Sequence, residues 1–162
     1  MKLSRRDLLK LHNGMTMLEG RQFSVKFSYF IAKNKVKLAD EIAALNEARQ
    51  ASEEYRQYDL ERAKMAQEYA DKNEDGTAKI HENSFVITAR AEEFQTDLAE
   101  LRENNKDIIE EYESKMKEFE ELLNGEVDFD GAKIDFKDIP STIEPALLEV
   151  LILADLIIEE DA

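Results

Sequence analysis

One segment of this sequence, DKNEDGTAKIHE at positions 71–82, has the residue types and the spacing of a metal site. Its acids and amide follow the EF-hand pattern D-x-N-x-D-G-x5-E. Calcium binds hard oxygen ligands, about six to eight in all. The pattern would supply them from Asp71, Asn73, Asp75, the carbonyl of Thr77 and a bidentate Glu82. The spacing therefore makes Ca²⁺ a candidate cofactor.

The residues around this segment favour a different structure. The eighth position is Ala78, where EF-hands usually carry a branched apolar residue, and the sequence has no second loop with this pattern. An exiting helix should already have begun at Glu82, yet the next residues are turn formers and then β-formers. The preferred interpretation is a turn at residues 74–76, followed by a hairpin that pairs residues 78–81 with residues 85–87. Calcium-dependent binding is kept as an alternative.

No other motif points to catalysis. The two histidines, His12 and His81, form no H-x-x-x-H or H-E-x-x-H arrangement, which argues against zinc. The sequence contains no G-x-S-x-G, no phosphate-binding loop and no dinucleotide fingerprint. It also has no cysteine, which excludes thiolate ligands and a cysteine nucleophile. We therefore expect a protein that is not an enzyme, with no catalytic residues and no required cofactor.

Composition and charge limit the fold and the partners. With 162 residues, 36% of them charged, five Gly and two Pro, the chain is expected to form one helix-rich domain, residues 1–162. The net charge is −15, which disfavours direct binding to nucleic acid. Residues 1–37 nevertheless hold nine Lys or Arg against two acids. This basic part is expected to dock on the acidic remainder, or else on an acidic partner.

Targeting and membrane signals are not expected to be present. The first residues lack the continuous apolar run of a signal peptide. No stretch approaches the roughly 20 apolar residues that span a bilayer. Together with the lack of cysteine, this pattern favours the cytosol and no membrane partner.

Hydrophobic periodicity predicts three helical segments in the first three quarters of the chain. A short helix begins at Ser4, which forms a capping box with Asp7, and Gly20 is expected to stop it. A long amphipathic helix covers residues 24–71, with a bend or break at residues 50–52. A second long helix covers residues 88–124 and carries a heptad seam of Phe94, Leu98, Leu101, Asn105, Ile108, Tyr112, Lys115, Phe119 and Leu122. Antiparallel pairing of the two would make a coiled-coil hairpin with residues 71–87 at its tip.

The last quarter predicts a small base. In residues 126–137 apolar residues alternate with acids on both sides of Asp130-Gly131, which indicates a β-hairpin. Pro145 opens a helix, PALLEVLILADLII, that is apolar nearly all round. It is either a core helix or a docking helix. Its candidate partner-binding residues are Leu147, Leu148, Leu151, Ile152, Leu156 and Ile157. The acidic tail at residues 159–161 is unfavourable at a helix C-terminus, so we expect it to fray.

The predicted fold is therefore mainly α with a minor β part. A long antiparallel helical hairpin over residues 24–124 projects from a base formed by residues 1–23 and 125–162.

The order of these segments resembles a family of uncharacterised helical proteins encoded by tailed bacteriophages. The resemblance rests on LLKLHNGMTMLEG, VKFSYFIAKNKVKLADEIAALNEAR, YADKNEDGTAKI and EVDFDGAKIDFKDIP, and it covers most of the chain. The chain departs from it around residues 51–63, which extend the coiled coil, and in its longer C-terminal LILADLIIEEDA. The resemblance implies a phage or prophage origin, and hence the host bacterial cytoplasm, but little chemistry.

These observations predict a non-catalytic phage protein that acts through protein–protein contacts, as an assembly or structural accessory protein. Its expected partners are further copies of itself, in a homo-oligomer, or a phage or host protein. One alternative is an acidic inhibitor of a host defence or nucleic-acid-binding protein, similar to an anti-CRISPR mimic. The other is the calcium-dependent binding module.

Overall fold

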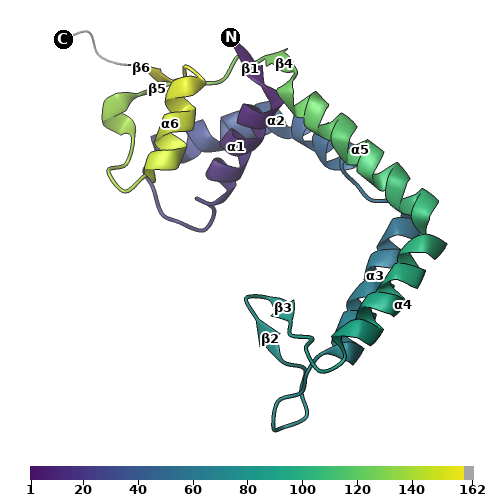
Figure 1. Cartoon of the computed structure of the whole chain (residues 1–162). Coiled ribbons are helices and arrows are strands. Elements are labelled where there is room, and N and C mark those ends of the chain that lie inside the picture. Colours follow the sequence, from purple (N-terminus) through teal and green to yellow (C-terminus); the bar gives the residue numbers. More distant parts are fainter. Residues whose placement is uncertain (159–162) are drawn as a thin grey trace. The chain divides into compact units, whose positions relative to one another are not determined.

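The computed structural model describes residues 1–158, and the acidic tail with its expected fraying lies outside this part (Figure 1). The described residues are mainly helical, which confirms the predicted class. The helices are α1 Arg5–Thr16, α2 Val25–Ala48, α3 Glu53–Tyr69, α4 Ala91–Asn104, α5 Lys106–Asn124 and α6 Pro145–Leu153, with a 3-10 helix at Phe136–Asp138. The strands are β1 Lys2–Ser4, β2 Ile80–His81, β3 Ser84–Phe85, β4 Glu126–Asp128, β5 Ile134–Asp135 and β6 Ile157–Ile158.

The chain folds as two compact units. Unit 1 comprises Met1–Arg49 and Glu118–Ala162, and unit 2 comprises Gln50–Lys117. The hydrophobic core lies in unit 1, where α1, α2 and α6 bury their apolar faces together with Phe129, Ile134 and Leu156. In unit 2 the buried hydrophobic side chains are Tyr58, Ala70 and Leu98. The predicted organisation as a single domain stays a prediction.

The N-terminal helix forms where its capping box predicts. Ser4 Oγ accepts a hydrogen bond from the Asp7 N–H at 3.1 Å, which satisfies one of the free amides of the first turn. The stripe of Leu8, Leu11, Met15 and Leu18 is buried, as its spacing requires. The helix ends at Thr16, however, four residues before Gly20, and Gly20 instead closes the following turns with a φ of +80°.

Both long helices are divided. The break expected at residues 50–52 is confirmed: Ser52 caps α3 by accepting from the Tyr55 N–H, and Lys115 Nζ donates to the Gln50 carbonyl at 2.6 Å. The prediction of one unbroken helix over residues 88–124 is wrong. Asn105 ends α4, and its side chain donates to the Leu101 carbonyl at 2.9 Å. In unit 2, α3 and α4 lie side by side (Figure 1), while the longer coiled coil stays a prediction.

The β-hairpin predicted for residues 126–137 is wrong. β4 pairs antiparallel with β1 instead, and β5 pairs parallel with β6. The segment between β4 and β5 is held by Asn34, a buried side chain of α2. Its amide accepts from the Ala132 N–H at 2.8 Å and donates to the Ala132 carbonyl at 3.0 Å. This side chain takes the place that a partner strand would have at residue 132, so the segment does not fold back on itself.

Gly131 allows this close approach. A Cβ at this position would lie 2.2 Å from Leu156 Cδ2 and 2.9 Å from Asn34 Oδ1. Asn34 could have been recognised from the sequence as a residue with a special role, because it is the one polar residue in the stripe of α2 that is buried. Sequence reasoning missed it.

The C-terminal helix is shorter than predicted. α6 ends at Leu153, and Asp155 takes a left-handed conformation with a φ of +51°. The Leu156 N–H then bonds to the Leu151 carbonyl, while the Leu156 carbonyl accepts from the Ile134 N–H at 2.9 Å. Ile157 and Ile158 are therefore strand residues paired with β5, because β5 offers them hydrogen bonds that sequence-local reasoning cannot see.

The Asn34 contact makes a first prediction. Replacing Asn34 by Ala leaves the half-buried N–H and carbonyl of Ala132 without the Asn34 side chain as a partner, which should lower the free energy of unfolding by about 1–3 kcal/mol. Urea unfolding followed by circular dichroism measures this change. The matched control is Asn46→Ala on the same helix, where the change should stay within about 0.5 kcal/mol. Equal stability of the two variants would contradict the role given to Asn34.

Candidate functional site

The calcium-loop residues of unit 2 form hydrogen bonds that close a loop. Asp71 Oδ1 accepts from the N–H groups of Thr88 and Ala89, both at 3.1 Å, and its second oxygen accepts from the Thr88 hydroxyl. The Asp71 backbone bonds to Val86 and Lys79. Asp71 therefore ties the end of α3 to the segment that leads into α4.

The middle of the same segment is a turn. Asp75 Oδ1 accepts from the Thr77 N–H at 2.9 Å and from its hydroxyl at 2.6 Å. Asn73 donates to the Thr77 hydroxyl at 3.0 Å, and Gly76 has a φ of +81°. These are the backbone contacts for which Asx residues and glycine are favoured in turns.

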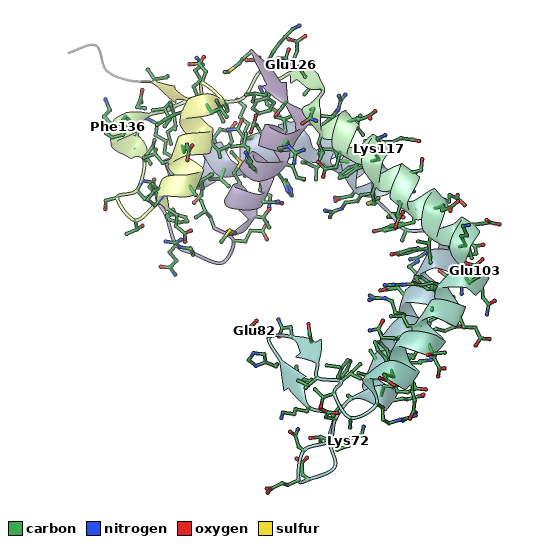
Figure 2. All side chains as sticks on the ribbon, in the orientation of Figure 1. Lys72, Glu82, Glu103, Lys117, Glu126 and Phe136 are labelled. Carbon is green, nitrogen blue, oxygen red and sulfur yellow. The ribbon has the colours of Figure 1, made fainter. Side chains whose placement is uncertain are left out.

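Glu82 lies at the other end of the segment, in the two-residue turn between β2 and β3 (Figure 2). It and Asn83 have φ values of +46° and +63°, as a type I′ hairpin turn requires. A hairpin forms here as predicted, but its turn is one residue shorter, because Ser84, which was expected in the turn, pairs with His81. Across residues 1–158, no group of three or more His, Cys, Asp or Glu side chains could hold a metal ion, so the structure does not gather Asp71, Asp75 and Glu82.

The candidate partner-binding residues of the C-terminal segment divide by burial. Leu147, Leu151 and Leu156 are buried in the core of unit 1 and are not available to a partner. Leu148 and Ile157 are half-buried, and Ile152 is exposed. The structure thus assigns half of the predicted contact set to the core, because α6 packs against α1 (Figure 1).

A groove of about 440 Å³ runs between α1 and α6, wholly within unit 1. Gly14 lets the two helices approach, since a Cβ there would lie 2.8 Å from Leu147 Cδ1. The groove has an apolar floor, and Met17 and Leu153 stand at its edge with 69% and 49% of their surface exposed. Lys10 and Asp7 lie on the α1 side, where they pair with each other at 3.2 Å, and Glu144 and Glu149 lie on the α6 side. An apolar floor with a charged rim is the usual anatomy of a protein–protein contact.

Sequence reasoning missed Met17 and Leu153. A signal was available for Met17, because it is an apolar residue outside the buried stripe of α1. Leu153 gave no such signal, since every face of the C-terminal segment is apolar and only the packing decides which one is exposed.

A larger hollow of about 860 Å³ lies in unit 2, against Tyr55 and Tyr58. Its charged residues are of both signs, with Arg62, Arg102 and Lys106 beside Glu103, Glu110 and Glu113. Because these charges offset one another, the hollow favours neither an anionic nor a cationic ligand. We therefore take the α1–α6 groove as the candidate functional site.

The basic first part of the chain docks on acids of its own unit. Arg5 pairs with Glu41 at 2.5 Å and Arg6 with Glu120 at 2.7 Å. Lys26 pairs with Asp138 and Asp135, and these two carboxylates, Asp138 first, raise the pKa of Lys26 to about 12. The expectation that the basic segment contacts the acidic remainder within the chain is thus confirmed. Within residues 1–158, no helix is both long and apolar enough to cross a bilayer.

The loop contacts of Asp71 make a second prediction. Hydrogen bonds from the Thr88 hydroxyl and from the N–H groups of Ala89 and Thr88 lower the pKa of Asp71 below 3.8. The stabilisation of the closed loop by ionised Asp71 is therefore complete above pH 3.8 and is lost as the pH falls through the lowered pKa. Asp71→Ala should speed amide exchange at Thr88 and Ala89 about tenfold at pH 7.

Hydrogen exchange read by NMR, corrected for intrinsic rates, checks this expectation. Glu74→Ala, at an exposed position of the same loop, is the matched control and should leave both amides unchanged. Unchanged protection in Asp71→Ala would show that Asp71 does not hold the loop closed.

Comparison with known proteins gives no relative for this chain. No protein-family model, no curated protein and no solved structure matches it. The resemblance to phage proteins therefore stays an expectation, and the function has to be argued from the surfaces of the molecule.

Proposed function

We propose that this chain is a non-catalytic protein that associates with further copies of itself through the α1–α6 groove. The observation that carries the proposal is this groove, with exposed Met17 and Leu153 at the edge of an apolar floor. Ile152 of α6 is exposed as well, outside the residues that line the groove. Burying such side chains in a contact is favourable by about 25 cal/mol for each Å² of apolar surface.

The distribution of charge supports a second copy as the occupant. In a contact with two-fold symmetry each surface meets itself, and when the two-fold axis runs along the groove the α1 side of one groove faces the α6 side of the other. Lys10 would then approach Glu149 of the second copy, and Glu149 would approach Lys10. Lys10 and Glu149 are therefore complementary across such a contact, while Asp7 and Glu144 are further acids that line the groove.

The biological setting is part of the proposal. Self-association and protein contacts suit an assembly accessory protein of a tailed phage, and a phage origin is what the sequence resemblance implies. The antiparallel coiled coil expected for residues 24–124 belongs to this proposal too, supported by α3 beside α4 in unit 2.

No comparable support exists for the acidic inhibitor. Three cations of unit 2 pair with acids three residues away: Arg56 with Glu53, Arg62 with Asp59 and Arg90 with Glu93. Mimicry of nucleic acid would be better served by acids alone.

Sedimentation equilibrium of the whole chain tests the proposal. The wild-type chain should form a dimer, and Leu153→Glu should weaken its dissociation constant at least about tenfold by placing a charge at the apolar edge. Leu60→Glu, at an exposed leucine of unit 2, is the matched control and should leave the dimer unchanged.

Charge reversal tests the assigned pairing. Lys10→Glu and Glu149→Lys should each weaken the dimer, and the double variant should recover most of the loss. A wild-type chain that remains monomeric at millimolar concentration would contradict the proposed self-association.

A further inference from the structure

Two asparagines of this sequence are followed directly by glycine: Asn13 precedes Gly14, and Asn124 precedes Gly125. In such a pair the backbone nitrogen of the glycine can attack the side-chain carbonyl carbon, Cγ, of the asparagine. Glycine permits this attack because it has no side chain to block it and the widest choice of backbone angles. The other asparagines precede residues that carry a side chain, which hinders the attack. The two Asn-Gly pairs are therefore the asparagines to compare for spontaneous modification.

The structure protects the first pair. Asn13 and Gly14 lie inside α1, and the Asn13 carbonyl accepts a hydrogen bond from the Met17 N–H at 3.0 Å. Gly14 also packs closely on α6, since a Cβ there would lie 2.8 Å from Leu147 Cδ1. The backbone rotation that brings the Gly14 nitrogen to Asn13 Cγ would break several helical hydrogen bonds at once. Because a helix interior opens only at a large cost in free energy, Asn13 should react slowly.

The second pair lies at the end of a helix. Asn124 is exposed and is the last residue of α5, and Gly125 leads into β4, which pairs with β1 (Figure 1). The Gly125 N–H donates to the Leu122 carbonyl at 3.1 Å, and the Gly125 carbonyl accepts from the Arg5 N–H at 3.0 Å. The bond to Leu122 spans three residues, as in a 3-10 turn, whose hydrogen-bond geometry is poorer than that of an α-helix. Opening at Gly125 frees the attacking nitrogen while the rest of α5 stays folded.

A cation lies at the carbonyl that is attacked. Arg6 Nη2 donates to Asn124 Oδ1 at 3.4 Å, and it also pairs with Glu120 Oε2 at 2.7 Å. Attack on Cγ moves negative charge onto Oδ1. A guanidinium beside this oxygen stabilises the developing charge in the transition state. The structure thus combines a glycine, a helix end and a positive charge at Asn124.

We propose that Asn124 is a site of spontaneous deamidation in the folded chain and that Arg6 promotes the reaction. The Gly125 nitrogen forms a bond to Asn124 Cγ as its proton passes to water, and the side-chain nitrogen leaves as ammonia. One molecule of water then opens the five-membered succinimide. Addition at Cγ gives aspartate, and addition at the backbone carbonyl carbon gives isoaspartate, in which the main chain runs through Cγ. Overall, an amide and water become a carboxylic acid and ammonia, with no oxidation or reduction.

The reaction alters the junction between α5 and β4. Both products place a negative charge near Glu120 where the neutral amide was. Isoaspartate also lengthens the main chain by one carbon atom just before Gly125, whose carbonyl bonds to Arg5, and before Glu126, which pairs with Ser4. The isoaspartate product should therefore loosen the pairing of β1 with β4. This modification site goes beyond the proposed self-association and does not rest on it.

Peptide mapping by mass spectrometry tests the proposal on the full chain, incubated folded at mildly alkaline pH. Replacement of the amide by an acid raises the mass of the peptide that contains it, and chromatography separates isoaspartate from aspartate. Asn124 should be modified at least about tenfold faster than Asn13, because the helix raises the barrier at Asn13. In the urea-unfolded chain the two sites should react at similar rates, since glycine follows both.

Two variants test the part played by Arg6. Arg6→Gln should slow modification of Asn124 at least about threefold in the folded chain and leave it unchanged in urea. Arg21→Gln is the matched control: Arg21 is another exposed arginine of unit 1, it donates to the Thr142 carbonyl, and its loss should not change the rate at Asn124. Hydrogen exchange at the Gly125 amide measures local opening, so the variants are compared at equal opening.

Three results would overturn the modification site. One is modification of Asn13 as fast as that of Asn124 in the folded chain. Another is an earlier modification at any other asparagine. The third is an intact Asn124 in the folded chain after a time in which the unfolded chain is modified. An unchanged rate in Arg6→Gln, at equal opening of Gly125, would show that Arg6 does not promote the reaction.

Discussion

The fold of unit 1 depends on one side chain that bonds to a backbone peptide far along the sequence. Asn34 holds both the N–H and the carbonyl of Ala132, and Gly131 is small enough to let it do so. With residue 132 engaged by α2, the segments on either side must find other partners. β4 pairs with the N-terminal β1, and β5 pairs with β6. The buried side-chain amide of Asn34 in the apolar face of α2 thus influences which strands of unit 1 pair with one another.

The two units are stabilised in different ways. Unit 1 has a continuous hydrophobic core with many fully buried side chains. Unit 2 depends more on contacts near its surface, such as the stacked rings of Tyr55 and Tyr112 and the hydrogen bond from Tyr69 to Asp97. Arg90 adds to this set by covering the Tyr69 ring. Because apolar burial is the largest favourable term in folding, unit 2 should open locally at lower free energy than unit 1.

Two groups of exposed apolar side chains of unit 1 lie in separate places. One group lies at the groove between α1 and α6, which Lys10, Asp7, Glu144 and Glu149 line with charge. The other lies on the outward face of α2, where Val25, Tyr29 and Val36 are exposed.

The sequence by itself determined what short-range rules control. The cap at Ser4, the buried stripe of α1, the break before Ser52 and the hairpin turn at Glu82 and Asn83 all depend on residues a few positions apart. Only the tertiary structure decided the rest. The end of α6, the pairing of β5 with β6 and the loss of the hairpin at residues 126–137 depend on partners more than twenty residues away. Local preference leaves such pairings nearly equal in free energy, and packing and buried hydrogen bonds select among them.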